Sequence, residues 1–143
     1  MLLGEPARTA GDLNFSLFGI PVRVHPFFWL ITLFLGPIRS QRPDILYAVL
    51  AWILAVFISI LIHELGHALV QRAYGYRPWI TLYGLGGLAS YDPAAVYQPR
   101  GSPTVRQILI SAAGPGAGFL MQVIGLPWKE FSSIGTVEQR LAI

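Results

Sequence analysis

Residues 45–73 decide the fold of this chain, and they read ILYAVLAWILAVFISILIHELGHALVQRA. Residues 45–62 contain no charge, and the helical pattern then continues through the polar cluster HELGH. A helix over 45–73 would be roughly 43 Å long at about 1.5 Å per residue, whereas the hydrocarbon core of a bilayer is about 30 Å thick. The sequence therefore predicts a membrane-spanning helix whose HELGH cluster lies inside the bilayer, close to one membrane face.

The composition of the whole chain also indicates a membrane protein. Its 143 residues are 54% hydrophobic and 12% charged, with a mean hydropathy of +0.56, whereas soluble domains carry roughly 25% charged residues. This length fits a single domain over 1–143. The chain has no cysteine, which excludes disulfides and thiolate metal sites. It also has no basic run or basic helix face, so we expect no nucleic-acid partner.

The remaining segments predict a small number of elements. Residues 1–14 are polar and punctuated by Gly and Pro, and they are expected to form a flexible N-terminus; residues 15–24 are expected to be extended. Two further apolar stretches, 25–38 and 105–128, predict membrane helices, and β-prone runs around a Gly-rich turn predict a β-hairpin over 79–91. The predicted fold class is thus an α-helical integral membrane protein with about three membrane-embedded helices and a small β-hairpin between the second and third.

The distribution of basic residues indicates how the chain is oriented. With three spans, six basic residues share one side of the membrane and four share the other. Cytosolic loops carry the excess of Lys and Arg, so the majority favours a cytosolic N-terminus and an HELGH cluster toward the cytosol. We expect a multi-pass protein of a prokaryotic cell membrane, because the chain is small and its start lacks a signal-peptide pattern. The six are Arg8, Arg23, Arg72, Arg77, Arg100 and Arg106; the four are Arg39, Arg42, Lys129 and Arg140.

The HELGH cluster has the spacing of a metal site. His63 and His67 are four residues apart and therefore lie about 40° apart on one face of a helix, where both can bind the same ion. Glu64 borders that face, where it can hold a water and take its proton. The pattern predicts a Zn²⁺ site, in which zinc lowers the pKa of a water to about 7. A chance pattern is the alternative, but a charged residue at the bilayer centre costs roughly 2.5–3.5 kcal/mol, so ionisable groups there are functional by default.

A catalytic zinc takes three protein ligands, and the third ligand is less evident from the sequence. His25 lies at the start of the first predicted span, on the same side as the cluster, and is a possible third ligand. An interfacial histidine beside Pro26 is the alternative and is favoured. Among the acidic residues considered, Asp44 falls on the opposite side of the membrane, and Asp92 is better explained as a turn residue.

The wider sequence resembles the site-2 proteases, which are intramembrane zinc metalloproteases. Besides HELGH, the similar stretches are LFGIPVRVHPFFWL at 17–30, TLYGLGGLAS at 81–90 and SAAGPGAGFL at 111–120. They occur in the same order as in the family and span most of residues 15–125. This ordered set is more specific than an isolated zinc motif.

The resemblance implies that the chain cleaves a peptide bond in or near the transmembrane helix of a protein or peptide substrate within the lipid bilayer. It assigns the ligands and the general base to the residues of the cluster, namely His63, His67 and Glu64. It also implies that the hairpin edge around Gly86, Gly87 and Leu88 pairs with an unwound substrate strand. An exposed strand edge suits this role because it offers main-chain hydrogen bonds.

Two features depart from the family pattern and leave alternatives open. The family's third ligand is an aspartate in a further helix, usually within Leu-Asp-Gly, and residues 1–143 contain no such motif. Many members carry an asparagine three residues after the proline of the Ala-Gly-Pro stretch, where this chain has Gly118. A partial chain therefore stays open, as does a pseudoprotease that binds metal or substrate without cleaving. A membrane metal carrier fits less well, because its ionisable residues would follow a path rather than cluster at one depth.

Overall fold

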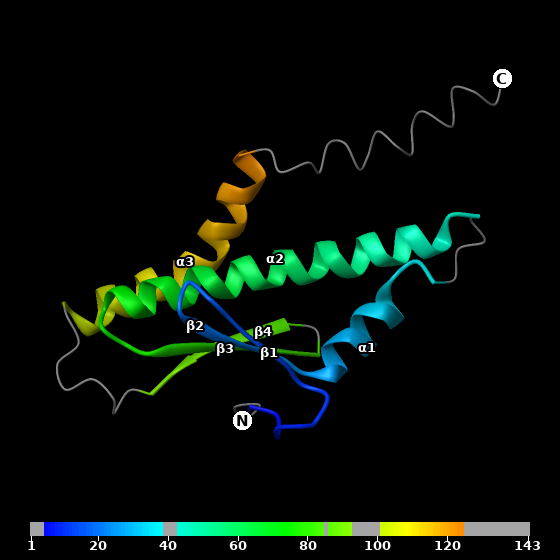
Figure 1. Cartoon of the computed structure of the whole chain (residues 1–143). Coiled ribbons are helices and arrows are strands. Elements are labelled where there is room, and N and C mark those ends of the chain that lie inside the picture. Colours follow the sequence, from blue (N-terminus) through cyan, green and yellow to red (C-terminus); the bar gives the residue numbers. More distant parts are fainter. Residues whose placement is uncertain (1–4, 39–42, 85, 93–100, 125–143) are drawn as a thin grey trace.

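A computed structural model describes residues 5–38, 43–84, 86–92 and 101–124 (Figure 1). A sheet of four strands lies against the C-terminal part of a long central helix, and two further helices flank that helix. The elements in chain order are β1 (Leu13–Leu17), β2 (Ile20–Val24), α1 (Pro26–Leu35), α2 (Ile45–Ala73), β3 (Pro78–Tyr83), β4 (Gly86–Tyr91) and α3 (Pro103–Val123).

The sheet consists of two antiparallel hairpins placed side by side. Its order is β1-β2-β3-β4, with β2 and β3 parallel and with β1 and β4 at the edges. The first hairpin turns through Phe18 and Gly19, which have φ angles of 51° and 77°, as the tight turns that match strand twist require. The hairpin predicted over 79–91 is present as β3 and β4, but it is only half of a larger sheet, to which the extended segment 15–24 also contributes.

The core is a single cluster between the sheet and helices α1 and α2. Alternate residues of the two central strands point into it, because successive side chains of a strand face opposite sides. Its buried members are Ile20, Val22, Val24, Phe28, Leu61, Leu65, Ala68, Ile80 and Leu82. The cluster includes three residues from the HELGH half of α2 and thereby fixes that half over β3 and β4.

The N-terminal segment contacts the opposite, polar face of the sheet. Arg23 and Thr81 are register partners on the central strands. Both donate to Glu5 Oε1, Arg23 over 3.0 Å and Thr81 over 2.6 Å. Arg23 also donates to Asp12 over 3.1 Å. The segment expected to be flexible is thus tied to the sheet as far as the structure describes it, since the buried guanidinium of Arg23 requires acidic partners.

Helix α2 has the predicted bounds of 45–73. Within the described part of the chain it is the helix that is long and apolar enough to cross a membrane, by length and composition. Only 6% of its most apolar window is buried inside the protein, unlike the core helix of a soluble domain. Helix α1 covers ten residues within the predicted 25–38, and α3 covers 103–123. Residues 125–128 of the predicted third helix lie outside the described residues.

Candidate metal centre

The two histidines of HELGH face each other on α2. Their Nε2 atoms are 3.2 Å apart, and the ring planes are inclined by 79°. Zinc takes nitrogen ligands at about 2.0–2.1 Å in tetrahedral geometry, which places two such nitrogens roughly 3.3 Å from each other. The separation of the His63 and His67 nitrogens therefore fits two ligands of one zinc ion.

A backbone carbonyl from α3 orients one of these rings. His67 Nδ1 lies 2.6 Å from the carbonyl oxygen of Ile110. A carbonyl can only accept, so Nδ1 carries the hydrogen and Nε2 keeps its lone pair toward His63. Metal-ligating histidines in proteins usually have such a partner on the second nitrogen, which fixes the tautomer and the ring orientation.

Small residues allow α3 to approach the site closely. A Cβ on Gly66 of α2 would lie 2.4 Å from the carbonyl oxygen of Ala113, and a Cβ on Gly114 of α3 would lie 2.2 Å from His67 Nε2. Neither contact is sterically possible without a shift of the neighbouring atoms. The helix then continues through Pro115 and bends (Figure 1), as helices do at an internal proline. Glycine at 66 and 114 is therefore what lets the two helices meet at the histidine pair.

Glu64 connects the cluster to the sheet. Its side chain is buried, and its Oε2 accepts a hydrogen bond of 2.9 Å from the backbone N–H of Ala89 in β4. A Cβ on Gly87 would lie 2.3 Å from Glu64 Cγ, so the strand can pass this close only with glycine there. The carboxylate is thus held between α2 and the outer edge of β4.

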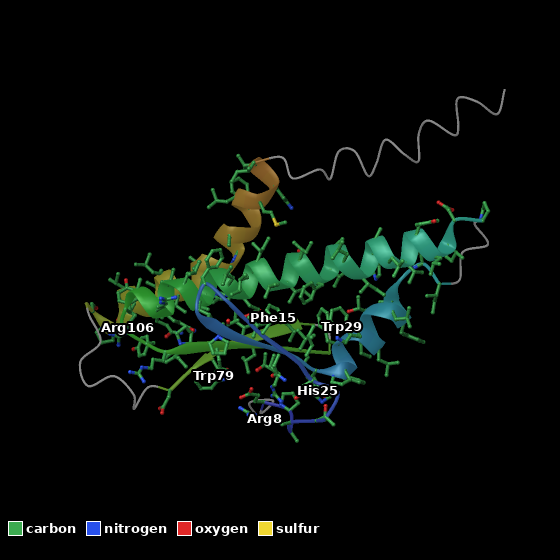
Figure 2. The ribbon with its side chains drawn as sticks, viewed as in Figure 1. Arg8, Phe15, His25, Trp29, Trp79 and Arg106 are labelled. Atoms are coloured by element: carbon green, nitrogen blue, oxygen red, sulfur yellow. The ribbon has the colours of Figure 1, made fainter. Side chains whose placement is uncertain are left out.

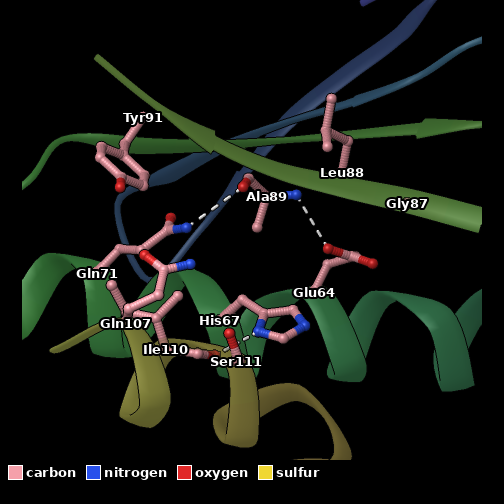
Figure 3. A pocket seen from close by; sticks show the side chains of 10 residues that line it. All are labelled: Glu64, His67, Gln71, Gly87, Leu88, Ala89, Tyr91, Gln107, Ile110 and Ser111. Carbon is pink, nitrogen blue, oxygen red and sulfur yellow. Dashed lines mark hydrogen bonds between the residues drawn. The ribbon is translucent and has the colours of Figure 1, made fainter. Parts of the chain in front are cut away.

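A cleft of about 370 Å³ opens between α2, β4 and α3, beside the histidine pair. Figure 3 shows Glu64 and His67 on one side of it and β4 across from them. Its ten lining residues are Glu64, His67, Gln71, Gly87, Leu88, Ala89, Tyr91, Gln107, Ile110 and Ser111. A carboxylate, an imidazole and a strand edge are therefore accessible from one cavity.

The structure brings together most of the site residues that the sequence predicted. His63, Glu64 and His67 lie in one cluster, and Gly87 and Leu88 line the cleft. Within the described residues, no group of three His, Cys, Asp or Glu side chains is arranged to hold a metal.

His25, the possible third ligand, has a local role in the structure. It caps the start of α1, where its Nδ1 accepts from the N–H of Phe27 over 3.1 Å, and its ring packs edge-on against Tyr83. Figure 2 shows His25 beside the start of α1, below the middle of the molecule in this view, whereas Arg106 of α3 lies near its left end. The structure thus gives His25 a capping and packing role at the start of α1.

Several cleft residues were not identified from the sequence. Gln71 follows His67 by one helical turn, so a search for further polar residues on the HELGH face would have found it. Ala89 carries no such signal, because it acts through its backbone N–H and C=O. Gln107 and Ser111 come from α3 and join the cleft through tertiary packing.

Comparison with known proteins places these features in context. The model of peptidase family M50 matches residues 51–133. The chain is 30% identical over 121 residues to the zinc metalloprotease MJ0392 of Methanocaldococcus jannaschii. The aligned region covers 84% of this chain and 33% of that protein. The chain is also 42% identical over 88 residues to the Synechocystis protein sll0528, which is provisionally named a zinc metalloprotease. This aligned region covers 54% of this chain and 23% of that protein. Among solved structures, the site-2 protease from M. jannaschii matches with a TM-score of 0.56 and 27% identity, covering 84% of this chain and 52% of that one. The chain thus spans a third or less of the length of these two curated relatives.

Proposed function

This chain belongs to peptidase family M50, the site-2 protease family, and from that premise we propose that it is an intramembrane zinc endopeptidase that hydrolyses peptide bonds in or near the transmembrane helices of its substrates. The observation that carries the proposal is the pair of imidazole nitrogens 3.2 Å apart, next to a carboxylate that reaches the edge of β4. One cleft then holds one of the two metal ligands, a base and a strand edge, and the second ligand, His63, lies directly beside it. These are the parts that hydrolysis of an unwound peptide needs.

The residues of the cluster have distinct roles in this reaction. His63 and His67 would hold the zinc, which supplies a water of lowered pKa and polarises the scissile carbonyl. Glu64 accepts the proton of the attacking water on its carboxylate and delivers it to the leaving nitrogen. In the absence of substrate, the N–H of Ala89 and the glycine at position 87 fix where this carboxylate lies. Positioning of the base is therefore a property of β4 as well as of α2.

The outer edge of β4 is the surface proposed to pair with the substrate. Ala89 is opposite Ile80 in the register, and its N–H and C=O both bond to side chains of α2 instead of β3. Because outward and inward pairs alternate along an antiparallel strand, Gly87 and Tyr91 also direct their backbone groups outward. This refines the predicted set of Gly86, Gly87 and Leu88, in which only Gly87 has the outward register.

The exposed surfaces of the helices support a membrane location. All three helices carry large apolar side chains that are more than half exposed, and apolar surfaces of this extent mark contact with lipid or with another protein. Those on α1 are Leu30, Phe34 and Leu35, those on α2 include Leu46, Leu50 and Leu54, and those on α3 include Phe119, Leu120 and Val123. We propose that all three helices are embedded in a prokaryotic cell membrane with the cleft toward the cytosol.

A second candidate function is a pseudoprotease that binds metal or substrate without cleaving. It is favoured by one observation: in the part of the chain that the structure describes, no third ligand joins the histidine pair. Two nitrogen ligands are fewer than the three that catalytic zinc sites use. The two candidate functions differ in whether cleaved peptide is released, because a pseudoprotease binds metal or peptide but releases no product.

The test combines metal analysis with cleavage of a transmembrane peptide in detergent. Glu64→Gln removes the proton acceptor and keeps the shape of the side chain, so zinc content should stay the same while cleavage falls roughly 10²–10⁴-fold. Asp44→Asn, the same acid-to-amide change at the start of α2, is the matched control and should alter neither quantity. Unchanged cleavage by Glu64→Gln would remove Glu64 as the base. Zinc binding without cleavage by the unaltered chain would favour the pseudoprotease.

A further inference from the structure

The end of the cleft beyond His67 contains a buried amide with an unused acceptor. Gln71 is 3% exposed, and its Nε2 donates to the carbonyl oxygen of Ala89 over 3.3 Å. Its Oε1 is buried and has no hydrogen-bond partner among the described residues. Turning the amide over would place two acceptors, Oε1 and the Ala89 oxygen, against each other, so this orientation is the bonded one. A buried polar atom without a partner is costly, so a ligand group that donates to Oε1 would remove this cost.

The neighbours of Gln71 indicate the chemistry of that group. Gln107 of α3 and Tyr91 of β4 lie next to Gln71, and Ser111, one turn after Gln107, lines the cleft nearer to His67 (Figure 3). All of these side chains are neutral, and each can donate or accept a hydrogen bond. The subsite thus suits uncharged groups that both donate and accept, of which the peptide group is the most abundant in a protein substrate.

The distance from the catalytic cluster fits an extended peptide. Glu64 and Gln71 bond to the N–H and to the C=O of the same residue, Ala89. Because a strand rises about 3.3 Å per residue, the polar ends of the two side chains are separated by roughly one or two residues of extended chain. A peptide paired with the outer edge of β4 would therefore pass Gln71 about one or two residues from the bond that is cleaved.

We propose that Gln71 is a substrate-positioning residue, whose carboxamide pairs with a main-chain peptide group of the extended substrate about one or two residues from the scissile bond. The proposal rests on the function proposed above and adds a register-setting contact on α2. The substrate N–H that reaches Oε1 satisfies the unused acceptor, while Nε2, displaced from Ala89, becomes available to the substrate carbonyl. The contact is made to the main chain of the substrate and not to a side chain. It therefore selects for an unwound segment, whose peptide groups are free to pair, and not for a particular residue.

The experiment measures binding, so that it does not depend on turnover. The probe is a fluorescent peptide with an apolar segment of about 20 residues, interrupted at its centre by Gly-Ser-Gly. Its affinity is measured by anisotropy in detergent micelles for the Glu64→Gln protein, which keeps the peptide intact. A series of peptides then replaces one amide at a time by an ester, which removes a single N–H. The same series is measured with Gln71→Met added, and Gln122→Met near the exposed end of α3 is the matched control.

We expect Gln71→Met to weaken binding of the all-amide peptide about three- to tenfold, as the loss of one hydrogen bond predicts, and Gln122→Met to leave it unchanged. An ester at one position of the peptide should weaken binding to the protein with Gln71 and have no effect on binding to the protein with Gln71→Met. A merely structural role of Gln71 would not produce this difference. Identical ester profiles with and without Gln71, or tighter binding by Gln71→Met, would overturn this proposal and leave the proposed function intact. Absence of peptide binding by the Glu64→Gln protein would overturn both. If Gln71→Met does not fold, an ester profile with no sensitive position in the Glu64→Gln protein would by itself refute the contact.

Discussion

Replacing Gly114 with alanine tests whether α3 sets the geometry of the two histidines. A Cβ at this position would lie 2.2 Å from His67 Nε2 and 2.8 Å from His63 Nε2, closer than real Cβ atoms approach. Reaching an ordinary contact of 3.4 Å with His67 Nε2 requires a relative shift of about 1.2 Å. The ring of His67 cannot move away freely, because its Nδ1 is held by the carbonyl of Ile110 on the same helix as the new methyl group.

The expected loss of zinc affinity follows from this shift. Ligand distances at zinc sites stay within about 0.2 Å of their ideal values, so a displacement several times larger removes at least one nitrogen from the metal. Changes that only disturb the orientation of a zinc ligand cost roughly 10–100-fold in affinity. Since the new methyl group crowds both ligands, we expect a loss of about 100-fold, equivalent to roughly 2.8 kcal/mol.

Competition with a chromophoric chelator measures the zinc affinity of the purified protein in detergent, and circular dichroism measures its helix content. Gly116→Ala is the matched control, because it makes the same change in the same helix and its Cβ would meet no described atom within 4 Å. It should bind zinc as the unaltered chain does. Unchanged zinc affinity in Gly114→Ala, at normal helix content, would refute metal binding through the nitrogens that face Gly114.

Three further predictions concern the base, the helix contact and the N-terminal segment. Gly87→Ala would place a Cβ 2.3 Å from Glu64 Cγ, so peptide cleavage should fall roughly 100-fold at unchanged zinc content; Gly86→Ala has open space around it and should cleave normally. Gly66→Ala should lower the free energy of unfolding by about 1–3 kcal/mol, because it forces α2 and α3 apart, and thermal unfolding in detergent measures this loss. Desolvation by burial raises the pKa of the Glu5 carboxyl, but hydrogen bonds from side chains of β3 and β2 outweigh it and lower the pKa below its ordinary value. The stability that these contacts provide is therefore present above the ordinary carboxyl pKa and is lost as the pH falls through the lowered folded-state pKa. Glu5→Gln should accordingly unfold more easily at neutral pH and lose less stability on acidification, as denaturant titrations at several pH values would show.

Local sequence patterns are sufficient for the central helix and the HELGH cluster. The uncharged run before His63 predicts a helix, and the spacing of His63, Glu64 and His67 places them on one face of it by geometry alone. The structure reproduces the bounds of that helix and brings the two histidine nitrogens together. These features depend on residues within one or two helical turns, so a single sequence contains the information.

Contacts between distant segments could not be predicted in the same way. The parallel pairing of β2 with β3 joins residues more than fifty positions apart, and no local pattern specifies it. Glu5 contacts Arg23 of one of these strands and Thr81 of the other, so the sequence of 1–14 alone does not reveal that this segment is held by the sheet. For the same reason the sequence alone treats Arg23 as a charge that reports membrane orientation, whereas it is buried in the sheet with two acidic partners.

A buried strand edge must be satisfied, because each unpaired backbone group costs roughly several kcal/mol in an apolar medium. β4 is an edge strand, and the outward N–H and C=O of Ala89 receive their partners from α2, namely the carboxylate of Glu64 and the amide of Gln71. These two side chains together replace one residue of a missing neighbouring strand. On the proposed function, a peptide that pairs with Ala89 must displace both contacts, and it can do so without a net loss of hydrogen bonds only if it is extended. The fold then releases the base from Ala89 when an unwound main chain arrives, whereas a substrate that is still helical leaves the carboxylate bonded to the sheet.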